Sequence, residues 1–230
     1  MIHINARGGV FAIGAGGKTG GNDMALLDLE AFRAAALMDE PFKYLVVENF
    51  LRREVAPAVA RDFPEIAYPG LLPVEATQCG VNFRTLIEEL SGPAVARAFG
   101  EKFGLELSGQ PTMVTLRGRC QEKDGRIHTD SEAKLVTALL YFNEDWEAGG
   151  GRLRLLRGPD DLNDMIAEVP PNMGTLVAFR RSDKSFHGHE PYVGVRRYVM
   201  INWMANGFAA QREIMRHKIS AQAKKVLNYV

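Results

Sequence analysis

The chain has few cysteines, no long hydrophobic run and no net charge, and each absence excludes a class of protein. Cys79 and Cys120 lie 41 positions apart, so neither a disulfide framework nor a CxxC metal knuckle can form. No apolar run reaches the roughly 18 residues of a membrane-spanning helix. The 28 basic and 28 acidic residues cancel, which removes any overall field for nucleic acid or an anionic membrane. The apolar stretch at 10–13 is too short for a signal peptide, so we expect a cytoplasmic protein.

What the chain does contain is enough for one globular domain. Its 230 residues are 46% hydrophobic and 24% charged, close to ordinary folded proteins. Residues 5–22 include seven glycines, so we expect a flexible arm over 1–23. The domain itself is expected over 24–206. A helix with several basic residues is expected over 207–230, packed on the domain.

The pattern of elements changes near Pro111. Before it, we expect helices over 24–38 (behind Asp23 as N-cap), 54–61 and 85–99 (interrupted at 92–93), with one strand over 44–51. After it, short strand-like runs alternate with Gly, Pro, Asn and Asp clusters, at 112–117, 135–142, 152–156, 175–180 and 196–204. Many short strands at this spacing favour a sandwich or barrel.

Three residues form a candidate metal site: His128, Asp130 and His187. Side chains alternate along an extended backbone, so His128 and Asp130 point to the same side and can grip one ion. His187 follows 57 positions after the aspartate and supplies the third ligand from a distant strand. Two imidazoles and one carboxylate that leave other coordination positions open are typical of non-haem Fe(II) oxygenases.

Two consecutive arginines follow this pattern on the last expected strand, and only one of them points inward. Arg197 shares its face with Val199, Ile201 and Trp203, whereas Arg196 shares its face with Tyr198, Met200 and Asn202. We predict that Arg197 is the inward residue. A buried guanidinium needs a carboxylate partner, which is either a ligand or an internal Asp or Glu.

Further segments accompany these residues over roughly 41–206. They are Pro41 and Phe42 before the 44–51 run, the 136–143 strand, Trp146 before the glycines at 149–151, the 174–179 strand, the ten-residue step from His187 to Arg197, and Trp203. Together with the HxD motif, they resemble the 2-oxoglutarate and Fe(II)-dependent oxygenases, specifically the prolyl 4-hydroxylase-like group.

The resemblance implies a mainly β fold with flanking helices (α+β), a double-stranded β-helix of the jelly-roll, cupin-like type. It implies His128, Asp130 and His187 as iron ligands and Arg197 as the partner of the far carboxylate of 2-oxoglutarate. The family often has Ser or Thr two positions after the arginine, where this chain has Val199. A second hydrogen bond to the cosubstrate must therefore come from elsewhere, and the candidates are Thr137, Tyr141, Thr115 and Arg117.

The implied reaction is the hydroxylation of a C–H bond with O2, in which 2-oxoglutarate becomes succinate and CO2. Fe(II) and 2-oxoglutarate are the expected cofactors, with ascorbate as a candidate addition. Related halogenases lack the ligating carboxylate, so Asp130 favours hydroxylation over halogenation. The substrate class, a small molecule or a peptide, and the oligomeric state stay open.

Other charged and polar residues have candidate roles around the site. His189 competes with His187 as a ligand, but we favour His187 and place His189 beside the metal or the substrate. Lys134, Arg126 and Arg181 are candidates for the entrance, where positive charge suits an anionic substrate. Two alternatives keep the fold: a zinc hydrolase on the same three ligands, which gives an inward arginine no role, and a jelly-roll module that binds a ligand without catalysis.

Overall fold

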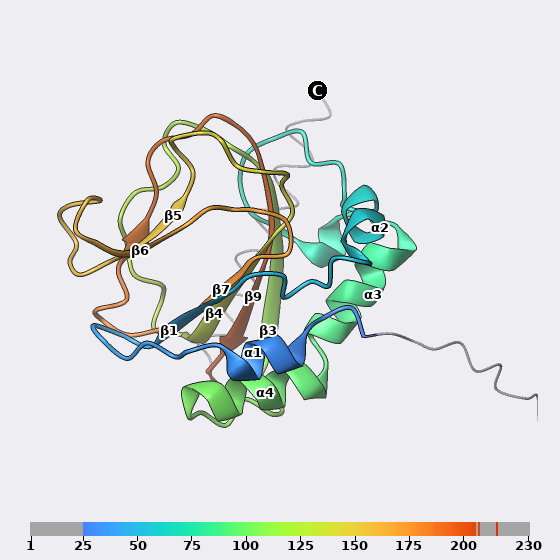
Figure 1. The fold of residues 1–230 in the computed structure, drawn as a ribbon, viewed down its shortest axis with the longest axis horizontal. Helices are drawn as coiled ribbons and strands as arrows, with labels where there is room; N and C mark the ends of the chain where they lie inside the picture. Colours follow the sequence, from blue (N-terminus) through green and yellow to red (C-terminus); the bar gives the residue numbers. More distant parts are fainter. Residues whose placement is uncertain (1–24, 206, 208–214, 216–230) are drawn as a thin grey trace, which may run out of the picture.

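The computed structural model describes residues 25–205 together with Gly207 and Met215, and its elements form three layers. Four helices lie on one face of a six-stranded sheet, and a three-stranded sheet lies on the other (Figure 1). The helices are α1 (Leu29–Ala34), α2 (Ala56–Arg61), α3 (Val81–Leu90) and α4 (Pro93–Phe103), with a short 3-10 turn η1 (Val74–Ala76). The strands are β1 (Tyr44–Val47), β2 (Leu72–Pro73), β3 (Thr112–Cys120), β4 (Lys134–Tyr141), β5 (Leu153–Leu156), β6 (Met165–Val169), β7 (Leu176–Arg180), β8 (His187–Gly188) and β9 (Gly194–Met204).

Both sheets are antiparallel, and their strand order is far from the chain order. The large sheet runs β1-β7-β4-β9-β3-β2, and the small sheet runs β6-β5-β8. The chain therefore crosses repeatedly between the sheets, as it does in a jelly roll. The strands in the middle of the large sheet, β4 and β9, are hydrogen-bonded on both sides.

Both faces of the large sheet are buried, which gives the molecule two hydrophobic cores. On β4, Val136, Ala138 and Leu140 belong to the core shared with the helices. Leu139 and Tyr141 alternate with them and belong to the core between the sheets. The near-continuous apolar run of β4 follows from this two-sided burial.

The helical layer is held by stacked aromatic rings. Phe99 of α4 lies 4.2 Å from the ring of Phe32 of α1 and 4.7 Å from the ring of Trp203 of β9. Phe99 is completely buried, so it joins two helices to the sheet. The helices thus cover the side of the sheet that faces away from the small sheet.

Most expected elements are present, with shifted ends. The five strands predicted after Pro111 appear as β3, β4, β5, β7 and β9, and the break at 92–93 separates α3 from α4. The first helix is shorter than predicted, because its N-cap is Asp28, whose carboxylate accepts a hydrogen bond from the Ala31 amide at 2.9 Å. Asp23, the arm over 1–23 and nearly all of the helix over 207–230 lie outside the described residues.

Three strands were not expected: β2, β6 and β8. Two of them contain only two residues, too few for an alternating pattern. None of the helices in the described part of the chain has the length and apolarity needed to span a membrane.

Candidate metal centre

The backbone places the two ligand histidines side by side. The amide of His128 donates to the carbonyl of His187 at 3.1 Å, and the amide of His187 donates to the carbonyl of His128 at 3.0 Å. Their ring centroids are 4.3 Å apart. Asp130 lies two positions beyond His128, and the nearest potential ligand atoms of the three residues all lie within 4.8 Å of one another. The structure thus brings together three residues that are up to 59 positions apart in the chain.

The surroundings of the two imidazoles suit metal ligation. Burial lowers the pKa of His187 to about 4, so this ring is neutral near pH 7 and its lone pair is free for a metal. Its Nδ1 lies 3.0 Å from the carbonyl oxygen of Ser185. The Nδ1 of His128 lies 2.9 Å from the carbonyl oxygen of Arg126. With the proton of each ring on Nδ1, these carbonyls fix the ring orientation and leave Nε2 as the ligand atom.

Asp130 is a buried carboxylate that stays charged. Burial alone would raise its pKa, but the charge of Lys134, the neighbouring His187 ring and hydrogen bonds from Lys134 and Thr137 bring the pKa down to about 2. The ammonium of Lys134 lies 2.8 Å from Oδ1, and the hydroxyl of Thr137 bonds to Oδ2. An anionic oxygen ligand is therefore available beside two imidazole nitrogens.

These donors fit a first-row divalent metal. Two imidazoles and one carboxylate are the donor set of non-haem Fe(II) sites, and they line a cavity of about 470 Å³ between the two sheets. The cavity leaves space beside the three ligands for further groups, as a catalytic site requires.

The cavity also contains one deeply buried guanidinium, that of Arg196. This residue is only 2% exposed, and its Nε donates to the carbonyl of Gly151 at 2.7 Å. The guanidinium carbon lies 5.4 Å from the ring centre of Tyr141 and 5.1 Å from that of Tyr198. No carboxylate among the described residues forms an ion pair with Arg196, so its charge is available to an anion in the cavity.

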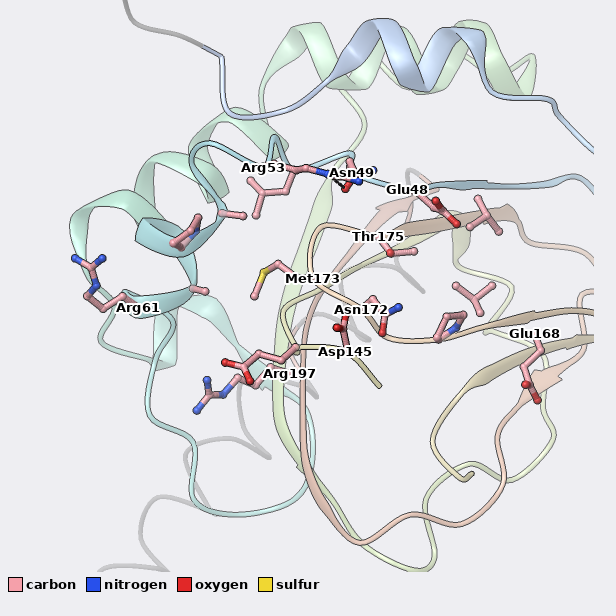
Figure 2. Close-up of a pocket in the computed structure, with 18 of the residues that line it drawn as sticks. Glu48, Asn49, Arg53, Arg61, Asp145, Glu168, Asn172, Met173, Thr175 and Arg197 are labelled. Carbon is pink, nitrogen blue, oxygen red and sulfur yellow. Dashed lines mark hydrogen bonds between the residues drawn. The ribbon is translucent and has the colours of Figure 1, made fainter. Parts of the chain in front are cut away.

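The prediction that Arg197 points inward is wrong. Arg197 is exposed, its guanidinium lies 5.9 Å from the ring of Phe63, and it lines a separate cavity of about 1050 Å³. Figure 2 shows Arg197 and Arg61 toward the α2 side of that cavity and Glu168 at the opposite end. The alternation along β9 was correct, but its apolar face packs against the helices instead of lining the metal cavity.

The backbone of Arg197 is held by the side chain of Asn143. The amide of Arg197 donates to Oδ1 of Asn143 at 2.7 Å, and Nδ2 of Asn143 donates to the carbonyl of Arg197 at 3.1 Å. A second bond, 2.7 Å long, joins Nδ2 to the carbonyl of Pro171. Asn143 therefore continues the pairing between β4 and β9 beyond the end of β4.

The residues predicted to bind the cosubstrate lie in different places. Thr137 lines the metal cavity but directs its hydroxyl to Asp130. Tyr141 is buried, and its hydroxyl accepts a 3.4 Å hydrogen bond from Arg196. Burial raises the pKa of Tyr141 to about 12, so the hydroxyl stays protonated. Arg117 lines the cavity and forms an ion pair with Asp124, whereas Thr115 is not among the lining residues.

The other residues predicted to lie near the metal or at the entrance also have different positions. His189 lines the cavity but is not part of the three-ligand cluster, and its Nδ1 lies 2.8 Å from the carbonyl of Glu190. Arg126 is exposed and lines the cavity. Lys134 lies inside, bonded to Asp130, and is not an entrance residue. Arg181 pairs with Asp183 and is not among the lining residues.

The sequence alone did not predict that Arg196 and Asn202 lie on the cavity side of β9. The asparagine in the middle of the strand is the sequence signal that identifies this face. Arg196 and Asn202 share a face of β9, and Asn202 donates from Nδ2 to the hydroxyl of Thr137 at 2.8 Å. A buried asparagine in a central strand indicates a polar environment on its face. The opposite face, with Val199, Ile201 and Trp203, is apolar throughout and suits a helical layer.

Comparisons with known proteins give one family match and several similar structures. Residues 118–205 match the sequence model of the 2OG-Fe(II) oxygenase superfamily. A prolyl 4-hydroxylase from Pseudomonas putida has a similar structure, with a TM-score of 0.52 and 19% identity over 73% of this chain and 95% of that one. A prolyl 4-hydroxylase from Phytophthora capsici has a TM-score of 0.48 and 21% identity, over 70% of this chain and 58% of that one. The viral collagen prolyl hydroxylase of Paramecium Bursaria Chlorella virus-1 has a TM-score of 0.49 and 13% identity, over 71% of this chain and 96% of that one. No curated protein matches the chain.

The fold is a double-stranded β-helix with an internal site of two histidines and one carboxylate, which defines the class. Within it, residues 118–205 match the 2OG-Fe(II) oxygenase superfamily, and the chain is prolyl 4-hydroxylase-like in fold. The protein is therefore a dioxygenase that uses Fe(II), 2-oxoglutarate and O2.

Proposed function

We propose that the protein hydroxylates a C–H bond of its substrate. The observation that carries the proposal is the cavity itself, which holds three metal ligands and a buried guanidinium without an acidic partner among the described residues. When bound, iron and 2-oxoglutarate would let O2 act as the oxidant: one oxygen atom would enter the C–H bond and the other would enter succinate, while 2-oxoglutarate would lose CO2.

In this reaction the protein holds the metal and orients 2-oxoglutarate. His128, Asp130 and His187 fix the metal, and the carbonyls behind the two rings keep their orientation. Arg196 receives the far carboxylate of 2-oxoglutarate in the place first assigned to Arg197, because its Nη atoms remain available beside the Nε bond to Gly151. The protonated hydroxyl of Tyr141 lies beside this guanidinium and supplies a second hydrogen bond.

The test is an anaerobic titration of the metal-free protein, first with Fe(II) and then with 2-oxoglutarate. A visible charge-transfer absorption that needs both additions supports the proposal. Succinate formation in air that disappears in Asp130→Ala supports it further. Metal binding without such a band would favour the zinc hydrolase, and unchanged function in Asp130→Ala would favour a binding module.

The charges around the cavity also bear on the substrate. Five basic side chains line it, from Arg117, Lys123, Arg126, Lys134 and Arg196, against two acidic ones, from Asp124 and Asp130. Lys123 and Arg126 are exposed on the turn before the HxD motif. Iron and 2-oxoglutarate together add no net charge, so the loaded cavity stays positive and favours an anionic substrate.

Matched compounds test the substrate charge. Amino acids and short peptides, including proline peptides, are compared with their amide or neutral analogues by succinate release. We expect the anionic member of an active pair to give the higher kcat/KM, and Arg126→Gln to reduce that preference. A neutral analogue that is turned over equally well would remove this assignment.

A further inference from the structure

Two side chains from one strand hold the metal-ligating carboxylate in different ways. Asp130 and Lys134 are each 8% exposed, and the ammonium lies 2.8 Å from Oδ1. Thr137, three positions further along β4, bonds to Oδ2. Both carboxylate oxygens are thus engaged inside the protein, one by a charged group and one by a neutral hydroxyl.

The direction of the hydroxyl bond is fixed by a third residue. Nδ2 of Asn202 has only protons to offer, and it lies 2.8 Å from Oγ1 of Thr137. The hydroxyl oxygen therefore accepts from Asn202, and its proton is directed to Asp130. Because Asn202 and Thr137 are almost completely buried, this chain of two hydrogen bonds sets the orientation of the carboxylate.

Lys134 has a different relation to a metal. A divalent cation held by Asp130, His128 and His187 shares one carboxylate with the ammonium, and the two cations repel each other across the buried cavity. Without metal, the ammonium compensates the buried charge of Asp130, which would otherwise be costly. Lys134 therefore stabilises the metal-free protein and opposes the metal.

Thr137 carries no charge and does not compete with the metal for Asp130. A carboxylate oxygen has lone pairs for both a hydrogen bond and a metal, so the Thr137 bond persists when the metal is present. Holding the carboxylate in place beforehand removes an ordering cost from metal binding.

We propose that Lys134 is an internal counter-ion that competes with the metal for Asp130, and that Thr137, supported by Asn202, is a positioning residue for the same carboxylate. The two neighbours of Asp130 then act on metal affinity in opposite directions. This inference rests on the proposed function only in requiring that the site binds a metal.

The experiment measures the dissociation constant of Co(II), and of Fe(II) without oxygen, by competition with a chelator in the full-length protein. We expect Lys134→Met to tighten metal binding about tenfold, since a buried like charge is removed. We expect Thr137→Val to weaken it about 10- to 100-fold. In addition, Lys134→Met lowers the melting temperature of the metal-free protein and enlarges the rise that saturating metal produces.

Matched controls separate these effects from general damage. Thr115 is a buried threonine of β3 whose hydroxyl has no partner among the described residues, so Thr115→Val leaves metal affinity within about twofold. Lys123→Met removes a charge from the same cavity at an exposed position and has a smaller effect than Lys134→Met. Thr137→Ser keeps the hydroxyl and restores most of the affinity.

The outcomes distinguish the inference from the proposed function. A wild-type protein that binds metal, with both Lys134→Met and Thr137→Val weaker, would overturn the inference and leave the function standing. Equal affinity in all variants would do the same. A wild-type protein that binds no metal would overturn both.

Discussion

Arg196 and Arg197 are consecutive residues with opposite environments. Arg196 is buried beside two tyrosine rings in the metal cavity, and Arg197 is exposed in a different cavity. A guanidinium that is removed from water without an acidic partner is unfavourable in the free protein. An anionic ligand compensates this cost, so binding and burial are coupled at Arg196.

The first prediction compares the two arginines. Arg196→Gln removes a charged donor that is expected to hold a carboxylate, a contact worth about 1.5–3 kcal/mol. We expect the concentration of 2-oxoglutarate for half-saturation to rise at least about tenfold, and metal affinity to change little. The measurement is a titration of the Fe(II)-loaded protein with 2-oxoglutarate.

Arg197→Gln is the matched control, because it removes the same group from the neighbouring position. We expect its half-saturation to stay within about twofold of the wild type, as is usual for exposed substitutions. A larger effect for Arg197→Gln than for Arg196→Gln would return the cosubstrate role to Arg197.

At the scale of elements, the sequence predicted the strands better than their faces. Runs such as 112–117 and 196–204 were readable because apolar residues lie between clear turn signals. Alternation also grouped Arg196 with Asn202 correctly. It left the inward face undecided, because both faces of β9 are buried and alternation alone does not say which core each one meets.

The candidate metal ligands could be predicted from the sequence for a different reason. His128 and Asp130 belong to one short motif, whose geometry is set by local extended backbone. The support around them was not readable: Asn202 reaches Thr137 from another strand, 65 positions away in the chain. Such contacts depend on strand register, which only the assembled sheet determines.

The second prediction concerns the turn before the HxD motif. Gly125 has a φ of +94°, and a Cβ there would lie 2.3 Å from the carbonyl oxygen of His189. Its own carbonyl accepts a hydrogen bond from the amide of His189 at 2.9 Å. We expect Gly125→Ala to cost about 1–3 kcal/mol of stability and to weaken metal binding.

Urea denaturation and a metal titration of Gly125→Ala test this together. Gly109 also has a positive φ, but a Cβ there meets nothing within 4 Å, so Gly109→Ala serves as the control for backbone strain alone. Equal metal affinity in Gly125→Ala and the wild type would show that this turn does not position the ligands.

The third prediction separates the helical layer from the metal site. Phe99→Ala removes a fully buried ring that stacks on Phe32 and packs against Trp203, and we expect a loss of about 3–5 kcal/mol in the free energy of unfolding. The metal cavity lies on the opposite face of the sheet, so the affinity of the folded fraction stays unchanged. Urea denaturation with a parallel metal titration measures both quantities.

At the scale of the whole molecule, the metal site joins both sheets. His187 belongs to β8 of the small sheet, whereas Asp130 bonds to Thr137 of the large sheet. A metal held by both residues therefore links the two layers across the inter-sheet core. Its binding free energy adds to the stability of the complete fold.

The fourth prediction follows from this link. Saturation with metal at about 100 times its dissociation constant is expected to stabilise the protein by about 2.7 kcal/mol, and chelation reverses the effect. Thermal unfolding with and without metal measures it. Asp130→Ala is the control, and a rise in its melting temperature equal to that of the wild type would place the metal elsewhere.

Asn143 fixes the register of β9, a strand whose two faces meet different cores. Its amide side chain binds both backbone groups of Arg197 from a position 54 residues earlier in the chain. Sliding β9 by one residue would break both bonds and exchange the two arginines between the cavities. The choice of the arginine that lines the metal cavity therefore depends on a residue outside β9, Asn143, which is not among the lining residues of that cavity. If the segment between β8 and β9 were shortened or lengthened, the hydrogen bonds of Asn143 would still hold β9 in its register. The arginine in the metal cavity would change only if those bonds broke.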